Sequence, residues 1–146
     1  MSVSVPRLGF LLIDVNRKLR QQVDYRAREV SLTQAQWYVL AYLSVNEGIQ
    51  QVGLADILGI KSITLARTVD KLQAKGLLER RPHPTDRRSW LLYLTQEACP
   101  TLAAMHEISK VLVAEAVAGV TEAEQKLFLD ILERIKVNMQ LAVEKP

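Results

Sequence analysis

Apolar residues recur every three or four positions near both ends of the chain. The N-terminal set comprises Leu8, Leu12, Val15, Leu19 and Val23. The C-terminal set comprises Phe128, Ile131, Leu132, Ile135, Met139 and Ala142. This spacing places each set on one face of an amphipathic helix, the first over residues 8–29. Because the C-terminal stripe is too long for a small central core to cover, we expect both helices to pack against a second copy of the chain. Packing inside one chain is the alternative.

A helix start is marked at Thr33. Thr33 and Gln36 have the spacing of a capping box, in which each side chain binds the backbone N–H group of the other residue. Leu32 and Trp37 stand at the positions of a hydrophobic staple around the same start. The sequence therefore predicts a helix that begins here and extends to Gly48.

A helix-turn-helix follows. Residues 51–58 predict a short helix, and Gly59-Ile60 turn the chain into a second helix that begins near Lys61. On the wheel of this second helix, the apolar Leu65, Val69 and Leu72 lie opposite the polar Thr64, Arg67 and Lys71. One face is therefore expected in the core, and the opposite face is cationic.

Two short strands are predicted after this helix. Gly76 can end the helix in the left-handed conformation, and residues 77–81 and 89–94 are rich in apolar and aromatic side chains. The six residues between the strands, 83–88, include a proline and three charged side chains. They are too many for a tight hairpin turn, so we expect them to project as a solvated finger. A helix-turn-helix followed by such a finger is a winged helix.

The remaining chain is expected to be helical. Thr95 is predicted to cap a helix that extends to about residue 118, with Pro100 distorting its first hydrogen bonds. Thr121 and Glu124 form a second capping box, which opens the final helix. The expected fold class is mainly α with a small β-wing, in which a winged helix-turn-helix is flanked by N- and C-terminal dimerisation helices.

Charge is concentrated in the winged segment. The whole chain has 19 Lys and Arg against 16 Asp and Glu, a net charge of +3. Residues 61–90 alone hold eight basic and three acidic residues, so this segment carries +5 and the rest of the chain carries −2. Such a patch is typical of proteins that bind a phosphate backbone, and a merely solvated helix face is the alternative.

Five short segments stand out together. They are Gly59-Ile60, the run from Leu65 to Leu72, Lys75-Gly76-Leu77, Asp86-Arg87-Arg88 and Leu94-Thr95. Their combination closely resembles the MarR family of winged-helix repressors, with the SlyA-like branch nearest. The resemblance covers nearly the whole chain. It implies a homodimer that binds double-stranded DNA at a pseudopalindromic operator and can be released by a small aromatic anion.

Candidate DNA contacts follow from the winged helix. The start of the basic helix should face the floor of the major groove, and the finger should reach the minor groove. The expected contacts are Ser62, Ile63, Thr64, Arg67, Thr68, Lys71, Arg87 and Arg88. Many members of the family carry proline where Ile63 stands. Arg67 can bind a guanine edge through two hydrogen bonds, with a phosphate contact or an ion pair with Asp70 as alternatives.

Supporting roles are assigned to other residues. Lys71 and Lys75 are expected to meet phosphates, and Asp86 is expected to hold an arginine of the finger in place. Trp90 is expected to pack at the base of the strands rather than to stack on a base. The effector pocket that the family resemblance implies has as candidates Arg17, Trp37 and His106.

No catalytic or metal-binding constellation is evident. His83 and His106 lie far apart in the sequence, and neither Ser nor Cys has a neighbouring base at motif spacing, so we expect no enzyme, metal or cofactor. The single Cys99 is expected to be a small buried structural residue, with a redox sensor as the alternative. No run of apolar residues approaches the length of a membrane span.

The sequence thus predicts a transcriptional regulator with one domain over residues 1–146. Residues 8–30 and 96–146 would supply the dimerisation helices, and residues 31–95 the DNA-binding lobe. We expect a cytoplasmic, nucleoid-associated bacterial protein. Two alternatives remain: a winged-helix module that binds other proteins, and a protein that packages DNA without regard to sequence.

Overall fold

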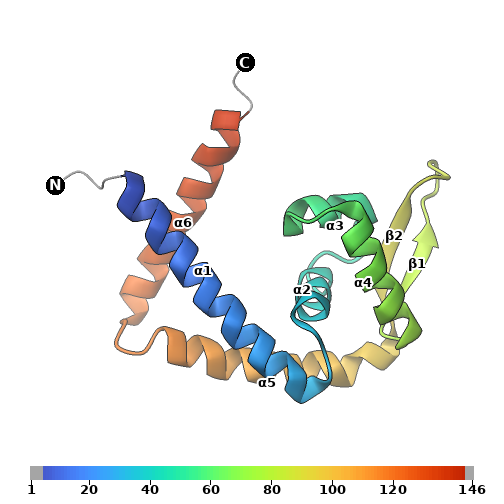
Figure 1. The fold of residues 1–146 in the computed structure, drawn as a ribbon, viewed down its shortest axis with the longest axis horizontal. Helices are drawn as coiled ribbons and strands as arrows, with labels where there is room; N and C mark the ends of the chain where they lie inside the picture. The colour runs from blue at the N-terminus through green and yellow to red at the C-terminus, as the bar shows by residue number, and fades with distance from the viewer. Residues whose placement is uncertain (1–4, 144–146) are drawn as a thin grey trace. The chain divides into compact units, whose positions relative to one another are not determined.

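The computed structural model describes residues 5–143 and confirms the mainly helical fold with a two-stranded sheet (Figure 1). Two compact units divide the chain, residues 1–109 and 110–146, and each is described by itself. The ends of the predicted domain, residues 1–4 and 144–146, lie outside the described residues. Within the described part, no helix has the length and apolar character needed to cross a membrane.

The first helix, α1, spans Val5–Ala27 and continues into a 3-10 turn over Arg28–Val30. The predicted helix over residues 8–29 is therefore confirmed, with a start three residues earlier. The turn ends at Ser31, which adopts the left-handed conformation with a φ of 57°. Of the predicted apolar stripe only Val23 is buried, and the positions from Leu8 to Leu19 remain exposed to solvent.

The capping box at the start of α2, Gln34–Leu43, is confirmed. The Thr33 hydroxyl oxygen accepts a hydrogen bond from the Gln36 backbone N–H at 3.2 Å, and Gln36 Oε1 accepts one from the Thr33 N–H at 3.0 Å. Leu32 and Trp37 are both buried, as expected of staple residues.

The prediction that α2 extends to Gly48 is wrong, because the helix ends at Leu43. Two side chains bind carbonyl groups of the last turn: Ser44 Oγ donates to the Ala41 oxygen, and Asn46 Nδ2 donates to the Tyr42 oxygen. Such local bonds compete with continuation of the helix. The chain then turns at Gly48, whose φ is 79° and whose N–H donates to the Leu92 oxygen.

Gly48 also lies close to the second strand, because a Cβ atom there would come within 2.9 Å of the Tyr93 hydroxyl oxygen. We expect Gly48→Ala to destabilise the fold by about 1 to 2 kcal/mol from its left-handed backbone alone, and by more from this contact. Gly76→Ala is the matched control, since Gly76 has a φ of 73° with no atom within 4 Å of the added Cβ. Urea unfolding of both variants should show the larger loss for Gly48, and equal losses would contradict the contact.

The helix-turn-helix has the predicted bounds. Helix α3 spans Gln51–Leu58, Gly59 ends it in the left-handed conformation, and α4 spans Ser62–Ala74. After α4, the Leu77 N–H donates to the Leu72 oxygen around Gly76, which is the bond pattern of a glycine helix end. Leu65, Val69 and Leu72 of α4 are fully buried. The core of this unit therefore lies between α4, the neighbouring helices α2 and α3, and the sheet.

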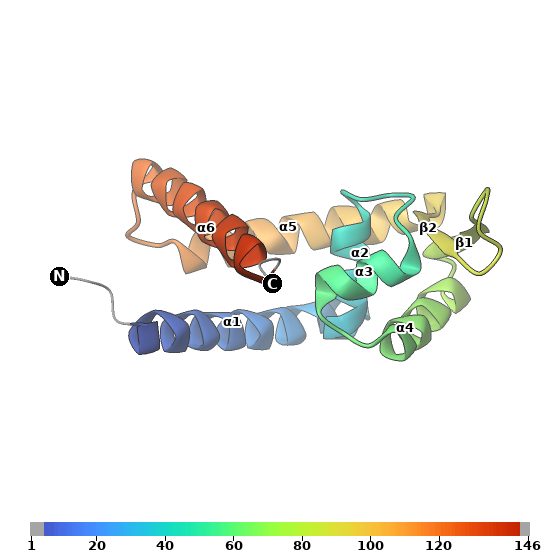
Figure 2. The ribbon, with the colours of Figure 1, turned by 90° about the horizontal axis from the view of Figure 1, so that it is seen from above.

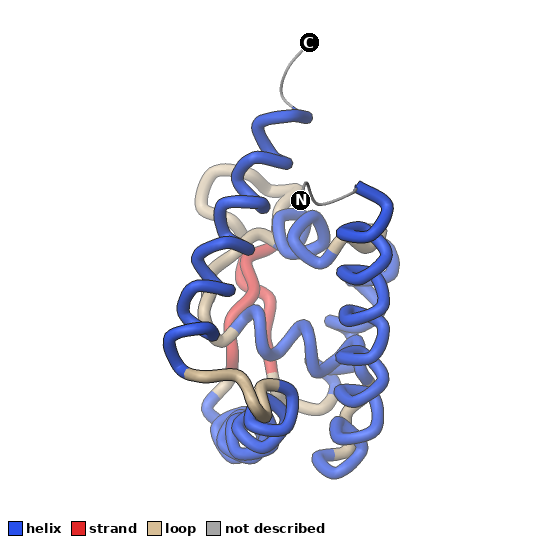
Figure 3. Tube along the Cα trace, turned by 90° about the vertical axis from the view of Figure 1, so that its left-hand side faces the viewer, coloured by secondary structure: helices blue, strands red, loops and turns tan. Residues whose placement is uncertain are grey.

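The wing is an antiparallel pair, β1 (Leu78–Pro82) and β2 (Trp90–Leu94), with Leu78 opposite Leu94 and Pro82 opposite Trp90. Figure 3 shows the two strands as the red segments. The loop before α3 adds to this ribbon, because Gln50 forms a bridge to Leu91. Figure 2 shows the wing and α4 at the same end of the first unit.

The prediction that the Thr95 side chain caps the next helix is wrong. Its hydroxyl donates instead to the Gly76 carbonyl oxygen, which ties the end of the wing to the end of α4. A 3-10 turn over Gln96–Ala98 then leads into α5, Cys99–Ala116, so that Pro100 stands in the first turn, where its missing N–H is tolerated. Helix α5 ends two residues before the predicted position.

The second capping box is confirmed at the start of α6, Glu122–Val143. Glu124 Oε2 accepts hydrogen bonds from both the N–H and the hydroxyl of Thr121, at 2.8 and 2.9 Å. The backbone bond from Thr121 lowers the pKa of the Glu124 carboxyl. No described residue of α6 is buried, although Phe128 and Met139 belong to its apolar stripe.

Candidate nucleic-acid interface

The outer face of α4 carries most of the predicted base-reading residues. Ser62, Ile63, Thr64, Arg67 and Lys71 are all exposed to solvent, and Ile63 has 59% of its surface accessible. The helix begins without a side-chain cap at Lys61, so the first backbone N–H groups of α4 are also free of a side-chain partner there. An exposed polar surface at a helix start suits an approach to the major groove.

Thr68 differs from the other predicted contacts. It is only 8% exposed, and its hydroxyl donates to the Thr64 carbonyl oxygen at 3.1 Å within α4. This position does not favour the predicted contact with DNA.

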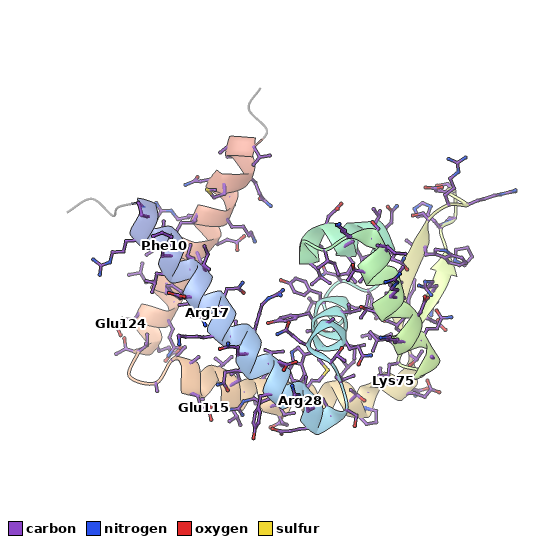
Figure 4. The ribbon with its side chains drawn as sticks, viewed as in Figure 1. Phe10, Arg17, Arg28, Lys75, Glu115 and Glu124 are labelled. Carbon is purple, nitrogen blue, oxygen red and sulfur yellow. The ribbon has the colours of Figure 1, made fainter. Side chains whose placement is uncertain are left out.

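Lys75 is held by the protein, although it was predicted to meet phosphate. Its ammonium group donates to the Ser31 carbonyl oxygen at 2.6 Å and lies 3.5 Å from Gln36 Oε1. Figure 4 labels this side chain at the C-terminal end of α4. Lys75 thus joins the end of α4 to the segment between α1 and α2.

Arg80 is the main structural feature that the sequence analysis missed. Arg80 lies on β1, and its NH1 atom is 2.7 Å from Oδ1 of Asp70 on α4. The alternative ion pair between Arg67 and Asp70 is therefore wrong, because Asp70 pairs with Arg80. The sequence offered no signal for this contact, since Asp70 and Arg80 lie on different elements.

The tip of the wing is ordered by short-range hydrogen bonds. His83 Nδ1 accepts from the backbone N–H groups of Thr85 and Asp86, at 3.2 and 3.1 Å. Asp86 Oδ1 accepts from the backbone N–H of Arg88 at 3.0 Å. Asp86 was predicted to hold an arginine of the finger in place, and in the structure it holds the backbone of Arg88. Trp90 is 46% exposed, so its ring is not enclosed at the strand base.

The structure divides the basic residues of the segment 61–90 into two groups. Arg81 pairs with Glu79 at 2.6 Å and lies 3.9 Å from the centre of the Tyr93 ring, so it is committed within the wing. A second group, which we call the open cations, forms no ion pair with any residue of the described chain. The open cations are Lys61, Arg67, Lys71, Arg87 and Arg88. They lie at the start and on the outer face of α4 and at the wing tip. A polyanion could bind these cations in place of the water and counterions around them.

The three predicted effector residues do not share one environment. Trp37 is buried in α2, His106 is exposed on α5, and Arg17 is exposed on α1, where it pairs with Asp14 at 3.1 Å (Figure 4). Of the three, only Arg17 lines a shallow depression between α1 and the start of α2. Its other lining residues are Ile13, Asn16, Arg20, Gln21, Asp24 and Gln34.

Arg20 connects this depression to the lobe. Its guanidinium carbon lies 5.3 Å from the centre of the Tyr38 ring, and its carbonyl oxygen accepts a hydrogen bond from Gln34 Nε2 at 2.6 Å. Burial raises the pKa of Tyr38, and the charge of Arg20 acts in the opposite direction. Arg17 and Arg20 both line the depression, and Arg20 also lies beside the Tyr38 ring, so these two cations could bind an anionic aromatic compound.

The prediction that Cys99 is buried is wrong, because its side chain is exposed at the start of α5. Packing is taken by the preceding Ala98, which is fully buried. Within residues 5–143, no group of three His, Cys, Asp or Glu side chains is arranged to hold a metal ion.

Comparison with known proteins shows which family shares this sequence and fold. Residues 30–89 match the model of the MarR family. The chain is 33% identical to the transcriptional regulator PA3341, over 91% of this chain and 98% of that one, with a TM-score of 0.82.

Two further structures are similar. A MarR transcriptional regulator from Methanosarcina mazei Go1 has a TM-score of 0.84 at 22% identity, over 92% of this chain and 97% of that one. A mutant of MarR from E. coli, solved with operator DNA, has a TM-score of 0.75 at 28% identity, over 90% and 94% of the two chains. The chain therefore belongs to the MarR family, and it is a transcriptional regulator with a DNA-binding winged helix rather than an enzyme.

Proposed function

We propose that the protein is a sequence-specific repressor that binds double-stranded DNA as a homodimer, at a pseudopalindromic operator. The observation that supports this most is the placement of the open cations on α4 and on the wing tip, the two elements that a winged helix inserts into grooves. We place the protein in the bacterial cytoplasm, associated with the nucleoid.

Selection of bound duplexes from random DNA tests this proposal. A two-fold symmetric site should emerge, with half-sites about one helical turn apart, since the symmetry of the site mirrors that of the dimer. Binding without an enriched sequence would favour a packaging protein. A failure to bind DNA at low salt would favour a module that binds other proteins.

The dimer is proposed from exposed apolar surface at both ends of the chain. On α1, Phe10 and Ile13 are 67% and 64% exposed, and on α6 Phe128 and Met139 are 55% and 64% exposed. Soluble monomers rarely leave contiguous apolar patches of this kind uncovered. We therefore assign residues 8–30 and 96–146 to dimerisation, and residues 31–95 to the DNA-binding lobe.

The division of labour between helix and wing follows from their chemistry. In this proposal Ser62, Ile63, Thr64 and Arg67 read base edges from the major groove, because that groove presents a distinct pattern for every base pair. Lys71 and Arg87 bind phosphates. Arg88 enters the minor groove, where a narrow groove concentrates negative potential.

Arg88→Ala should weaken binding to operator and random duplexes evenly, because the minor groove carries little sequence information. The salt dependence of binding should become shallower by about one unit per subunit, as for the loss of one cation–phosphate contact. Asp86→Ala should produce part of this loss, since the Arg88 backbone would no longer be held.

Arg81→Ala is the matched control for the wing, because Arg81 is already paired with Glu79 and stacked on Tyr93. Its removal should change the salt slope much less. The wing would be shown to stay outside the groove if Arg88→Ala left both affinities and the slope at the values of the unmodified protein.

A small aromatic anion is proposed as the effector, with Arg17 as the residue that binds its carboxylate. Trp37 and His106 remain candidates at lower rank, since neither lines the depression at Arg17. A ligand that favours a spacing of the two lobes unsuited to successive major grooves must lower DNA affinity by linkage.

We expect millimolar salicylate to weaken operator binding by about 5- to 150-fold, the usual range of coupling between two sites. Arg17→Ala should reduce this response, whereas Lys18→Ala, which removes an exposed cation of the same helix that does not line the depression, should preserve it. Titration of labelled operator with and without salicylate measures the response. An affinity that salicylate leaves unchanged would rule out this class of effector.

A further inference from the structure

Arg80 joins three elements of the DNA-binding lobe through one side chain. It stands in the middle of β1, and its side chain is 17% exposed. Its Nε atom donates to Gln51 Oε1 at 2.9 Å, on the first residue of α3. Its NH1 atom contacts Asp70 Oδ1 at 2.7 Å and Gln73 Oε1 at 3.3 Å, and its NH2 atom donates to the Ala66 carbonyl oxygen at 3.2 Å.

The acceptors on α4 form a single line along that helix. Ala66, Asp70 and Gln73 are spaced by four and three residues, so they lie on one side of α4 and face the wing together. A guanidinium group is planar and presents five donors in a fixed fork, which is why it can bind acceptors on different elements at the same time. Arg80 thereby fixes the angle between β1 of the wing and α4, the helix on which Arg67 lies.

These contacts also separate Arg80 from the open cations. Its donors are directed at protein acceptors, and Asp70 compensates its charge, so it has little capacity left for a phosphate. The neighbouring Arg81 gives a clear contrast, since Glu79 and Tyr93, which it contacts, both belong to the wing itself. Of the two arginines, Arg80 connects the wing to α4.

We propose that Arg80 is a positioning residue for DNA recognition, which holds α4 and the wing in the one relative orientation that lets both enter adjacent grooves of a duplex. This inference rests on the proposed function, because it requires α4 and the wing to bind the same DNA. Specific DNA demands both contacts in register, whereas random DNA is bound through phosphates that tolerate small shifts.

Arg80→Lys tests the inference while keeping the positive charge. A lysine ammonium is a point donor and cannot reproduce the fork, so the three elements should no longer be held together. We expect the ratio of operator affinity to random-DNA affinity to fall by about 5- to 150-fold, the range for one lost base-reading contact. The salt slope of binding to random DNA should stay unchanged, because the charge is kept and phosphate contacts tolerate small shifts. Arg81→Lys, the adjacent control, should leave the ratio as it is.

A second readout is the coupling between Arg80 and the wing tip. If Arg80 positions the wing, Arg88→Ala should cost less operator affinity in the Arg80→Lys background than in the unmodified protein. Should Arg80→Lys fail to fold, Gln51→Met removes one of the four partners without a change of charge. It should lower the same ratio by a smaller factor.

Three results would overturn the inference. The first is a lower melting temperature for Arg80→Lys with an unchanged affinity ratio and additive effects of Arg88→Ala, which is what a purely structural residue would give. The second is an equal loss on operator and random DNA with a salt slope shallower by about one unit, which marks a phosphate contact. The third applies if Arg80→Lys does not fold. It is a Gln51→Met variant that has the same ratio of operator to random-DNA affinity as the unmodified protein. An unmodified protein with no preference between duplexes would instead refute the proposed function.

Discussion

The Ile135→Glu variant should sediment as a monomer of about 16.5 kDa, or unfold, whereas the unmodified protein should sediment at about twice that mass. Ile135 is half-buried on the apolar stripe of α6, a helix of which no described residue is buried, and its stripe neighbours Ile131 and Met139 are exposed. In a two-fold interface each new carboxylate would be buried without a partner. Leaving an uncompensated charge in such a place costs about 3 to 5 kcal/mol, and the symmetry of the dimer imposes this cost twice.

Loss of the dimer should also abolish tight operator binding, because one lobe would contact only one half-site. Val137→Glu is the matched control. It changes a β-branched residue of the same helix that is 42% exposed and lies about 200° around the helix from Ile135. The control should remain a dimer. A well-folded, monomeric unmodified protein, or an Ile135→Glu variant that stays dimeric, would contradict the assignment of α6 to the interface.

Arg67→Ala should weaken operator binding by about 1 to 3 kcal/mol for each subunit, the range for a bidentate contact with a guanine edge. Binding to random DNA should hardly change, because such binding depends on phosphate contacts. Arg67 suits this role because it is exposed on α4 and forms no ion pair within the described residues, while the nearby Asp70 is occupied by Arg80.

Lys71→Ala is the control for Arg67→Ala, since it removes a cation one helical turn farther along the same exposed face. It should weaken operator and random DNA by similar factors and make the salt slope shallower by about one unit per subunit. Competition binding with the two duplexes measures both variants. An Arg67→Ala variant with an unchanged ratio of the two affinities would assign Arg67 to the phosphate backbone.

Features encoded by neighbouring residues were predictable from the sequence. The capping boxes at Thr33 and Thr121 were both found, because a box requires only two side chains three positions apart. The left-handed conformation of Gly76 and the turn at Gly59 were predicted for the same reason. The exposed face of α4 could likewise be predicted, because its apolar residues recur at the spacing of a helix.

Features that depend on contacts between distant residues were not predictable. The partner of Asp70 is Arg80, ten residues away on another element, and Lys75 binds the Ser31 carbonyl group 44 residues away. Arg80 and Lys75 were both counted in the basic patch, as if their charges were available to DNA. The end of α2 was also missed, because side chains after Leu43 bind carbonyl groups of its last turn, and the sequence pattern alone gives these bonds little weight.

The affinity of the unmodified protein for a duplex selected from random DNA and for its scrambled counterpart, measured across a salt series, tests the central claim most directly. We predict that the selected duplex is bound about a thousandfold or more tightly than the scrambled one, and that both affinities fall as salt rises. Equal affinities for the two duplexes at every salt concentration would contradict the claim that α4 and the wing read a DNA sequence.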